Sequence, residues 1–167
     1  MREYQYKFPI GDAKKILNAF ETSGIKFSNP VPYEYSYLKL PGVRRNGNRT
    51  LRIKEFEAKK VLDMKIKDGD GVIKKVIESE IVDVENMKKI LSEIGCEVEA
   101  IIKKKRRTFK NNLLRIDMDE IDGFGNFLEI KFREDGKLAA KKLMKSLGLD
   151  IKKSDKRSIS EIFRSAK

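Results

Sequence analysis

Histidine and tryptophan are absent from this 167-residue sequence, and cysteine occurs once. Without histidine there is no Ser-His or Cys-His nucleophile pair, no imidazole acid or base, and no zinc site of the ordinary kind. The single cysteine excludes a disulfide framework and, with no secretory signal at the start, predicts a cytoplasmic location. No apolar run approaches the ~20 residues of a membrane span. A metal ion would therefore be held by carboxylates, which favours Mg²⁺, Mn²⁺ or Ca²⁺.

The charge is strongly unbalanced, with 38 Lys and Arg against 26 Asp and Glu and a formal net charge of +12. Such an excess predicts a polyanionic partner, and on charge alone nucleic acid, a phosphorylated metabolite and an acidic membrane surface all remain open. Hydrophobic residues make up 40% of the chain, which excludes a disordered protein and provides for a packed core. We expect one domain over residues 1–167.

Apolar periodicity predicts four helices and eight strands. The helices are expected after the capping residues Asp12 and Asp83, from about Asp135 to Gly148, and after the capping box Ser158–Glu161. Alternating apolar and charged residues predict strands at 4–8, 51–54, 62–66, 77–81, 114–119 and 128–132, and segments 33–40 and 99–109 are predicted as strands with less clean alternation. Strand and helix order suggests repeated halves, 1–68 and 73–132, followed by a helical tail, 135–167. The expected fold is α+β, an eight-stranded, mostly antiparallel, closed or nearly closed β barrel with helices packed outside.

The polar side of these strands carries both signs of charge in quantity. Carboxylates such as Glu3, Glu78, Glu80, Asp119 and Glu129 alternate with Lys and Arg along the same strands. On an open sheet such a face would be solvated, but in a closed sheet it lines a lumen that has to hold water, ions or a charged ligand. A lumen of mixed sign is suited to a divalent cation and a polyphosphate bound together.

Seven short runs then resemble, in order and spacing, the CYTH domain, the triphosphate tunnel metalloenzyme family. The first, Glu3-x-Gln5-x-Lys7, is similar to its Glu-x-Glu-x-Lys signature. The others are Leu51-Arg52-Ile53-Lys54, Leu62-Asp63-Met64-Lys65, Glu78-Ser79-Glu80, Ile102-x-Lys104-x-Arg106-x-x-Phe109, Met118-Asp119 through Phe127-Leu128-Glu129-Ile130, and Arg157-Ser158-Ile159-x-Glu161-Ile162. Each run is weak alone, whereas their joint order across the chain is specific. The last two resemble most the branch of class IV adenylyl cyclases.

The resemblance implies a tunnel, a requirement for Mg²⁺ or Mn²⁺, and a triphosphate held by cations of the lumen. The implied metal ligands are Glu3, Glu80, Asp119 and Glu129. The implied phosphate-binding residues are Lys7, Arg52, Lys54, Lys65, Lys104 and Arg106. The implied catalytic set is Glu3, Lys7, Asp119 and Glu129. Phosphoryl or nucleotidyl transfer suits such a site, because positioning and charge neutralisation supply most of its catalysis.

Two residues depart from the family pattern. Gln5 stands where the signature has its second Glu, and Lys131 stands where the terminal strand has its last Glu. Both are expected to face the lumen, where together they shift the charge by about three units. The site would then bind one metal ion instead of two, clamp phosphate with cations alone, or lack catalysis.

Three functions follow from these observations. The first is a metal-dependent triphosphatase or adenylyl cyclase acting on a nucleotide, thiamine triphosphate or tripolyphosphate. The second is a non-catalytic binder of nucleotides or polyphosphate with a degraded metal site. The third, a nucleic-acid-binding protein, is disfavoured because the basic run at 103–107 alternates between two faces and has no interleaved aromatic residues for base stacking. We therefore expect a small-molecule triphosphate partner, no specific nucleic acid and no membrane; the sequence leaves the oligomeric state open, including a homodimer.

Overall fold

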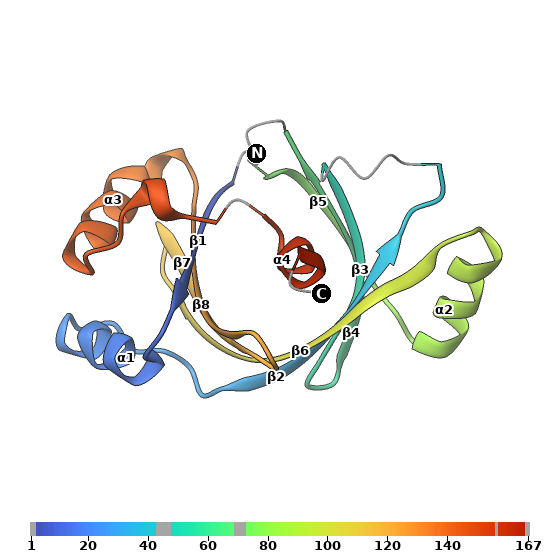
Figure 1. Ribbon diagram of the computed structural model, residues 1–167, viewed down its shortest axis with the longest axis horizontal. Helices are drawn as coiled ribbons and strands as arrows, with labels where there is room; N and C mark the ends of the chain where they lie inside the picture. The colour runs from blue at the N-terminus through green and yellow to red at the C-terminus, as the bar shows by residue number, and fades with distance from the viewer. Residues whose placement is uncertain (1–2, 43–47, 69–72, 156, 166–167) are drawn as a thin grey trace. The chain divides into compact units, whose positions relative to one another are not determined.

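The computed structural model describes residues 3–42, 48–68, 73–155 and 157–165. Glycine, asparagine and aspartate residues predict connecting loops at 42–48 and 68–71, and most of both loops lies outside these ranges. All eight expected strands are present (Figure 1), namely β1 (Tyr4–Ile10), β2 (Val31–Lys39), β3 (Arg49–Phe56), β4 (Lys59–Lys67), β5 (Ile73–Glu80), β6 (Glu97–Lys110), β7 (Leu114–Ile121) and β8 (Gly125–Phe132). The strands are the segments in which apolar and polar residues alternate, as expected for half-buried strands.

The strands form one eight-stranded sheet in the order β1-β8-β7-β6-β2-β3-β4-β5. The pairings of β1 with β8, β8 with β7, β7 with β6, β2 with β3, β3 with β4, and β4 with β5 are antiparallel. This confirms the predicted α+β fold class with an eight-stranded, mostly antiparallel sheet.

Contacts along the chain divide it into two compact units. Unit 1 contains 32–103 together with 157–167, and unit 2 contains 2–31 together with 104–156. The predicted single domain and its repeated halves stay predictions.

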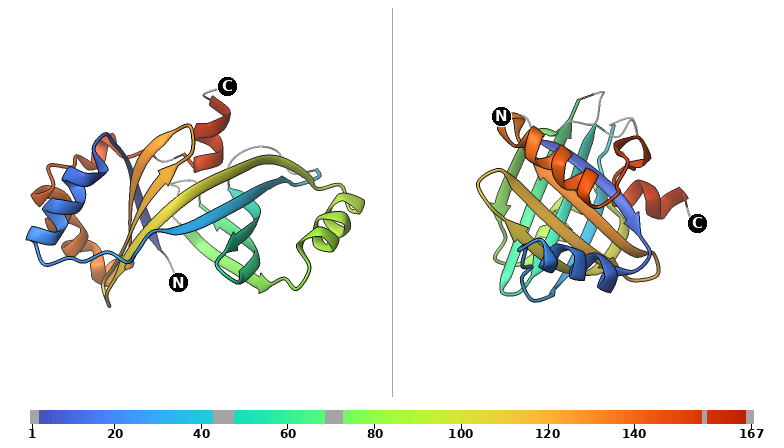
Figure 2. Two further views of the ribbon diagram at one scale, coloured as in Figure 1. Left: turned by 90° about the horizontal axis from the view of Figure 1, so that it is seen from below. Right: turned by 90° about the vertical axis from the view of Figure 1, so that its left-hand side faces the viewer.

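Unit 2 has its core between the sheet and two helices. Helix α1 (Ala13–Thr22) begins at Asp12, whose carboxylate accepts from the backbone N–H of Lys15, and α3 (Lys137–Ser146) follows a 3₁₀ turn, η1 (Glu134–Gly136). A second 3₁₀ turn, η2 (Ile151–Lys153), follows α3. Figure 2 (right) shows α1 and α3 on the same face of the strands. The buried residues there are Phe8, Ile10, Phe20, Leu114, Ile116, Met118, Leu128, Ile130, Phe132, Ala140 and Met144.

Unit 1 repeats this arrangement on a smaller scale. Helix α2 (Val84–Glu93) begins at Asp83, whose carboxylate accepts from the backbone N–H of Asn86. Its buried residues pack with β2 and β3, in a cluster of Leu38, Leu51, Ile53, Ile81, Val84, Leu91 and Cys96. The last helix, α4 (Ile159–Ser165), begins with the predicted capping box, in which the Ser158 N–H donates to Glu161 and the Glu161 N–H donates to the Ser158 hydroxyl.

In both units the apolar face of the sheet packs against helices, so the alternate residues of each strand project from the opposite face. Among the helices of the described residues, none is both long and apolar enough to cross a membrane.

Candidate functional site

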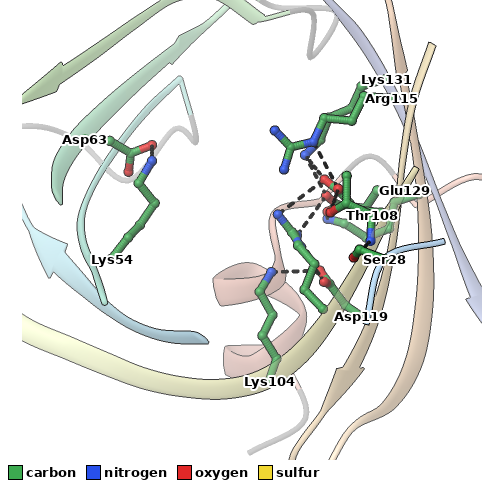
Figure 3. Close-up of polar contacts among 12 residues, drawn as sticks. Ser28, Lys54, Asp63, Lys104, Thr108, Arg115, Asp119, Glu129 and Lys131 are labelled. Carbon is green, nitrogen blue, oxygen red and sulfur yellow. Dashed lines mark hydrogen bonds and ion pairs between the residues drawn. The ribbon is translucent and has the colours of Figure 1, made fainter. Parts of the chain in front are cut away.

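Unit 2 gathers its charged side chains on the face of the sheet opposite the helices. The ladders place Lys7 of β1 opposite Glu129 of β8, and Glu129 opposite Asp117 of β7. Asp119 of β7 lies opposite Arg106 of β6. Directly paired residues of an antiparallel ladder point to the same side, so these five side chains share one face. Figure 3 labels Asp119 and Glu129 of this group together with neighbouring polar side chains.

Arg106 is the centre of this cluster. Its Nε and Nη2 donate to the two carboxylate oxygens of Asp119, each over 2.6 Å, in a bidentate pair. The same guanidinium lies 3.2 Å from Asp117 Oδ2 and 3.5 Å from Glu129 Oε2. Lys104, two residues earlier on β6, donates from Nζ to Asp119 Oδ2 over 2.7 Å (Figure 3). Asp119 is therefore neutralised by two cations of the neighbouring strand.

Asp117 is fully buried and binds a second group of donors. Lys131 Nζ lies 2.7 Å from its Oδ2, Arg115 Nε 3.0 Å from its Oδ1, and the Thr108 hydroxyl 2.8 Å from its Oδ1. Burial alone would raise the pKa of Asp117, but the positive charges of Lys131, Arg106 and Arg115 outweigh that effect and hold the pKa below its ordinary value. Asp117 is thus an ionised carboxylate, stabilised by its neighbours.

Glu129 receives the remaining cations. Lys131 Nζ lies 3.2 Å from Oε2, and Lys7 Nζ lies 3.7 Å from Oε1, which is an ion pair beyond hydrogen-bond distance. Both lysines are less than one-tenth exposed. Burial would raise the pKa of Glu129, whereas Lys131, Lys7 and Arg106 lower it well below its ordinary value.

Positive charge predominates in this cluster. Five cations lie within ion-pair distance of its three carboxylates, an excess of two charges. The cations are Lys7, Lys104, Arg106, Arg115 and Lys131. Glu3 adds one carboxylate to the same face by alternation, and one positive charge then remains in excess. A buried cluster of this sign attracts an anion with several negative charges.

Unit 1 carries a second charged group on its own polar face. Arg52 of β3 donates from Nε and Nη2 to the two oxygens of Asp63 on β4, over 2.5 and 2.9 Å. Lys54 Nζ lies 3.3 Å from Asp63 Oδ2 and donates to Glu78 of β5. Tyr35 of β2 lies under the guanidinium, 4.7 Å from Arg52 Cζ to the ring centroid, a cation–π contact. Burial would lower the pKa of Arg52, but the hydrogen bond to Asp63 raises it.

The remaining predicted residues are placed less centrally. Glu80 is exposed on β5, and neither it nor Glu3 forms an ion pair with another described residue. Lys65 lies two residues after Asp63 on β4. Burial raises the pKa of the Asp63 carboxyl, whereas Arg52, Lys54 and, to a smaller extent, Lys65 lower it. The metal-ligand, phosphate-binding and catalytic roles assigned by resemblance stay predictions.

The carboxylates of the described residues do not fit a resident metal ion as they are placed. No group of three or more Asp, Glu or Cys side chains in this part of the chain has the arrangement of a metal site. The chemistry of the donors gives the reason, since Asp117, Asp119 and Glu129 each contact at least two cationic side chains. An oxygen that already accepts a charge-assisted hydrogen bond is a poor ligand for Mg²⁺, which requires near-ideal octahedral geometry.

Two buried carboxylates at the centre of these charged groups were not assigned a role from the sequence. Asp117 and Asp63 are both fully buried from solvent. Each forms ion pairs with cationic side chains, Asp63 with Arg52 and Asp117 with Lys131. Alternation could have identified Asp117, because it precedes Asp119 by two residues and therefore lies on the same face of β7. Asp63 lies within a run that resembles the family pattern, but the resemblance implies a role only for Lys65 of that run.

Comparison with known proteins identifies relatives over nearly the whole chain. The family model described as CYTH domain matches residues 1–161. A candidate adenylate cyclase of Methanocaldococcus jannaschii, MJ0240, is 28% identical over 136 residues, which are 78% of this chain and 77% of that protein.

Two solved structures have similar folds. The PH1012 protein from Pyrococcus horikoshii has a TM-score of 0.82 and 23% identity, over 95% of this chain and 98% of its own. HpAC1 from Hippeastrum, whose structure is described as revealing a dominant triphosphatase activity, has a TM-score of 0.67 and 20% identity, over 100% of this chain and 97% of its own. At these identities the likeness concerns the fold.

Proposed function

The chain belongs to the CYTH family, and on that premise we propose that it binds the phosphate chain of a small-molecule triphosphate and hydrolyses it. The observation that carries the proposal is the buried cluster of unit 2, in which five cations surround three carboxylates on one face of the sheet. Fixed cations of this kind stabilise the charge of a transferring phosphoryl group without reorganising during the reaction.

The proposed phosphate-binding residues of unit 2 are Lys7, Lys104 and Arg106. Lys7 is proposed as a phosphate contact because it lies on the polar face of β1, directly opposite Glu129 of β8. Its side chain is nearly buried, so little conformational entropy remains to be lost when an anion binds. On the polar face of unit 1 we propose the same role for Arg52, Lys54 and Lys65.

We also propose Glu3, Lys7, Asp119 and Glu129 as the residues on which turnover depends. Membership of the family implies a divalent metal ion, and we propose Mg²⁺ or Mn²⁺, with Glu3, Glu80, Asp119 and Glu129 as its predicted ligands. Because the carboxylates of unit 2 are already paired with cations, either ion would enter as the counter-ion of the triphosphate substrate.

Hydrolysis is the first reaction to test. The Methanocaldococcus jannaschii relative bears a cyclase name, whereas the Hippeastrum structure is described by triphosphatase activity. Cyclisation requires the ribose 3′-hydroxyl to be aligned with the α-phosphate, whereas hydrolysis requires only a water molecule, so the cation cluster alone supports hydrolysis more directly. The substrate would be a nucleoside triphosphate, thiamine triphosphate or tripolyphosphate.

A second candidate function is non-catalytic binding of nucleotides or polyphosphate. It is favoured by Lys131, whose ammonium lies 2.7 Å from Asp117 and 3.2 Å from Glu129, where the family pattern has a carboxylate. Binding without turnover would follow if these carboxylates never reach a metal ion.

One screen distinguishes the two functions. Phosphate release is measured with ATP, thiamine triphosphate and tripolyphosphate, each with Mg²⁺ and with Mn²⁺, while cyclic AMP is assayed in parallel. Lys7→Met should reduce turnover at least tenfold, since one of the proposed phosphate contacts is lost. The matched control is Lys105→Met, which removes the same charge from an exposed residue next to Lys104 in β6.

Turnover that depends on Lys7 and not on Lys105 would support a triphosphatase. Tight binding without phosphate release or cyclic AMP would support the second candidate. If none of the three compounds binds, both proposals are wrong. The cytoplasmic location and the absence of specific nucleic-acid or membrane partners are part of the same proposal.

A further inference from the structure

Lys131 carries an inference about how the cluster of unit 2 is neutralised. We propose that the Lys131 ammonium takes the place of a metal ion beside Asp117 and Glu129, so that a polyphosphate binds this protein without a divalent cation. The inference rests on the proposed function, since it specifies the form in which the triphosphate is bound. It also accounts for the poor fit of the carboxylates to a resident metal.

The Lys131 ammonium occupies the space between two carboxylates. Lys131 Nζ lies between two acidic side chains, 2.7 Å from Asp117 Oδ2 and 3.2 Å from Glu129 Oε2. Its side chain is only 9% exposed, so the charge is largely withdrawn from water and has to be neutralised locally. A metal ion bridging the same two carboxylates would occupy this space and carry charge of the same sign.

Gln5 lies opposite Lys131 in the sheet. Gln5 of β1 and Lys131 of β8 are direct partners in the ladder, and their side chains therefore share the polar face. The two departures from the family pattern are thus direct neighbours in the sheet. Gln5 is a neutral amide at the position on β1 where the family pattern has a carboxylate. This is expected if Lys131 replaces a metal ion, because one ammonium carries less positive charge than a divalent cation and needs fewer carboxylates to balance it.

The carboxylates of Asp119 and Glu129 are also paired with cationic side chains. Both oxygens of Asp119 accept from Arg106, and one of them also accepts from Lys104. Glu129 lies within ion-pair distance of Lys7, Arg106 and Lys131. A divalent cation entering here would displace charge-assisted hydrogen bonds and face the repulsion of several fixed cations, whereas a phosphate anion would be attracted by them.

Calorimetry on the wild-type full chain tests the proposal without any variant. Tripolyphosphate is titrated into the protein in EDTA and again with excess Mg²⁺, and MgCl₂ and MnCl₂ are each titrated alone. We expect tripolyphosphate to bind at least as tightly in EDTA as in excess Mg²⁺. We expect the metal salts titrated alone to give no saturable heat. Saturable binding of either metal alone would overturn the proposal.

The double variant Gln5→Glu with Lys131→Glu tests the residues. It should bind tripolyphosphate at least tenfold more weakly in EDTA and recover with Mg²⁺ or Mn²⁺, because carboxylates replace the ammonium and supply oxygen ligands. Lys105→Glu is the control, since it reverses the charge of an exposed residue and should change neither titration by more than about twofold. An unchanged double variant would overturn the proposal.

Failure of this inference differs from failure of the proposed function. If wild-type protein binds tripolyphosphate only when Mg²⁺ or Mn²⁺ is present, the proposed function stands and the role of Lys131 is wrong. If wild-type protein binds tripolyphosphate under neither condition, the proposed function is wrong and the inference falls with it.

Discussion

Replacement of Asp117 by asparagine should destabilise unit 2 more than any surface substitution. Asp117 is fully buried and lies within 3.2 Å of charged nitrogens from Lys131, Arg106 and Arg115. Asparagine keeps the size of the side chain and an oxygen that accepts from the Thr108 hydroxyl, so the change removes mainly the negative charge.

The expected magnitude follows from the charges left behind. Removing one partner of a buried ion pair costs about 3–5 kcal/mol, because the other charge remains buried without compensation. Lys131 would retain Glu129 at 3.2 Å, and the positive excess of the cluster would grow by one charge. A loss at the lower end, about 3 kcal/mol, is therefore expected, which for a chain of this size lowers the melting temperature by roughly 6–12 °C.

Urea unfolding and thermal melting of the variant measure this loss. Glu120→Gln is the matched control, because Glu120 also lies on β7, but it is exposed and no described cation lies within ion-pair distance of it. The control should change the free energy of unfolding by less than about 0.5 kcal/mol. A loss below about 1 kcal/mol for Asp117→Asn would refute the conclusion that the cluster is held by buried charge.

Three further predictions concern pH and ligands. Burial raises the pKa of Asp63, but Arg52, Lys54 and Lys65 lower it below the ordinary value. Wild type should therefore be more stable than Asp63→Asn at pH 7, and this advantage should shrink as the pH falls below about 4. An advantage that did not shrink would contradict this prediction. Tripolyphosphate at about 100 times its dissociation constant should stabilise the fold by ~2.7 kcal/mol, and orthophosphate at the same concentration by less; equal melting curves would count against the phosphate site. Binding to duplex DNA should be independent of sequence and largely lost near physiological salt, and a sequence-specific nanomolar complex there would revive a nucleic-acid function.

The fold was largely predictable because its strands are amphipathic. Period-two alternation identified six of the eight strands clearly and β2 and β6 less cleanly, and the capping residues Asp12 and Asp83 marked the starts of α1 and α2. The pairing order was not predictable, since β6 lies next to β2 in the sheet although 57 residues separate the end of one from the start of the other. Alternation specifies which side of a strand is buried, but it says nothing about which strand is its neighbour.

The sequence predicted which charged side chains share the polar face, but not the network of contacts that joins them. Alternation placed Lys7, Asp119 and Glu129 on the polar side, which the ladders confirm. The partners of each carboxylate depend on the register between strands, so the sequence could not show that Arg106 pairs with Asp119 or that Lys131 pairs with Asp117. The same register makes Gln5 and Lys131 direct neighbours, which turns two isolated departures into one coupled feature.

We propose above all that buried cations of the sheet bind a triphosphate. The most direct test of this proposal is a calorimetric titration of tripolyphosphate into wild type, Lys7→Met and Lys105→Met under identical salt. The account predicts a saturable exothermic or endothermic isotherm for wild type and Lys105→Met, and a dissociation constant at least tenfold weaker for Lys7→Met. Equal weakening by the two substitutions, or binding that neither affects, would contradict it.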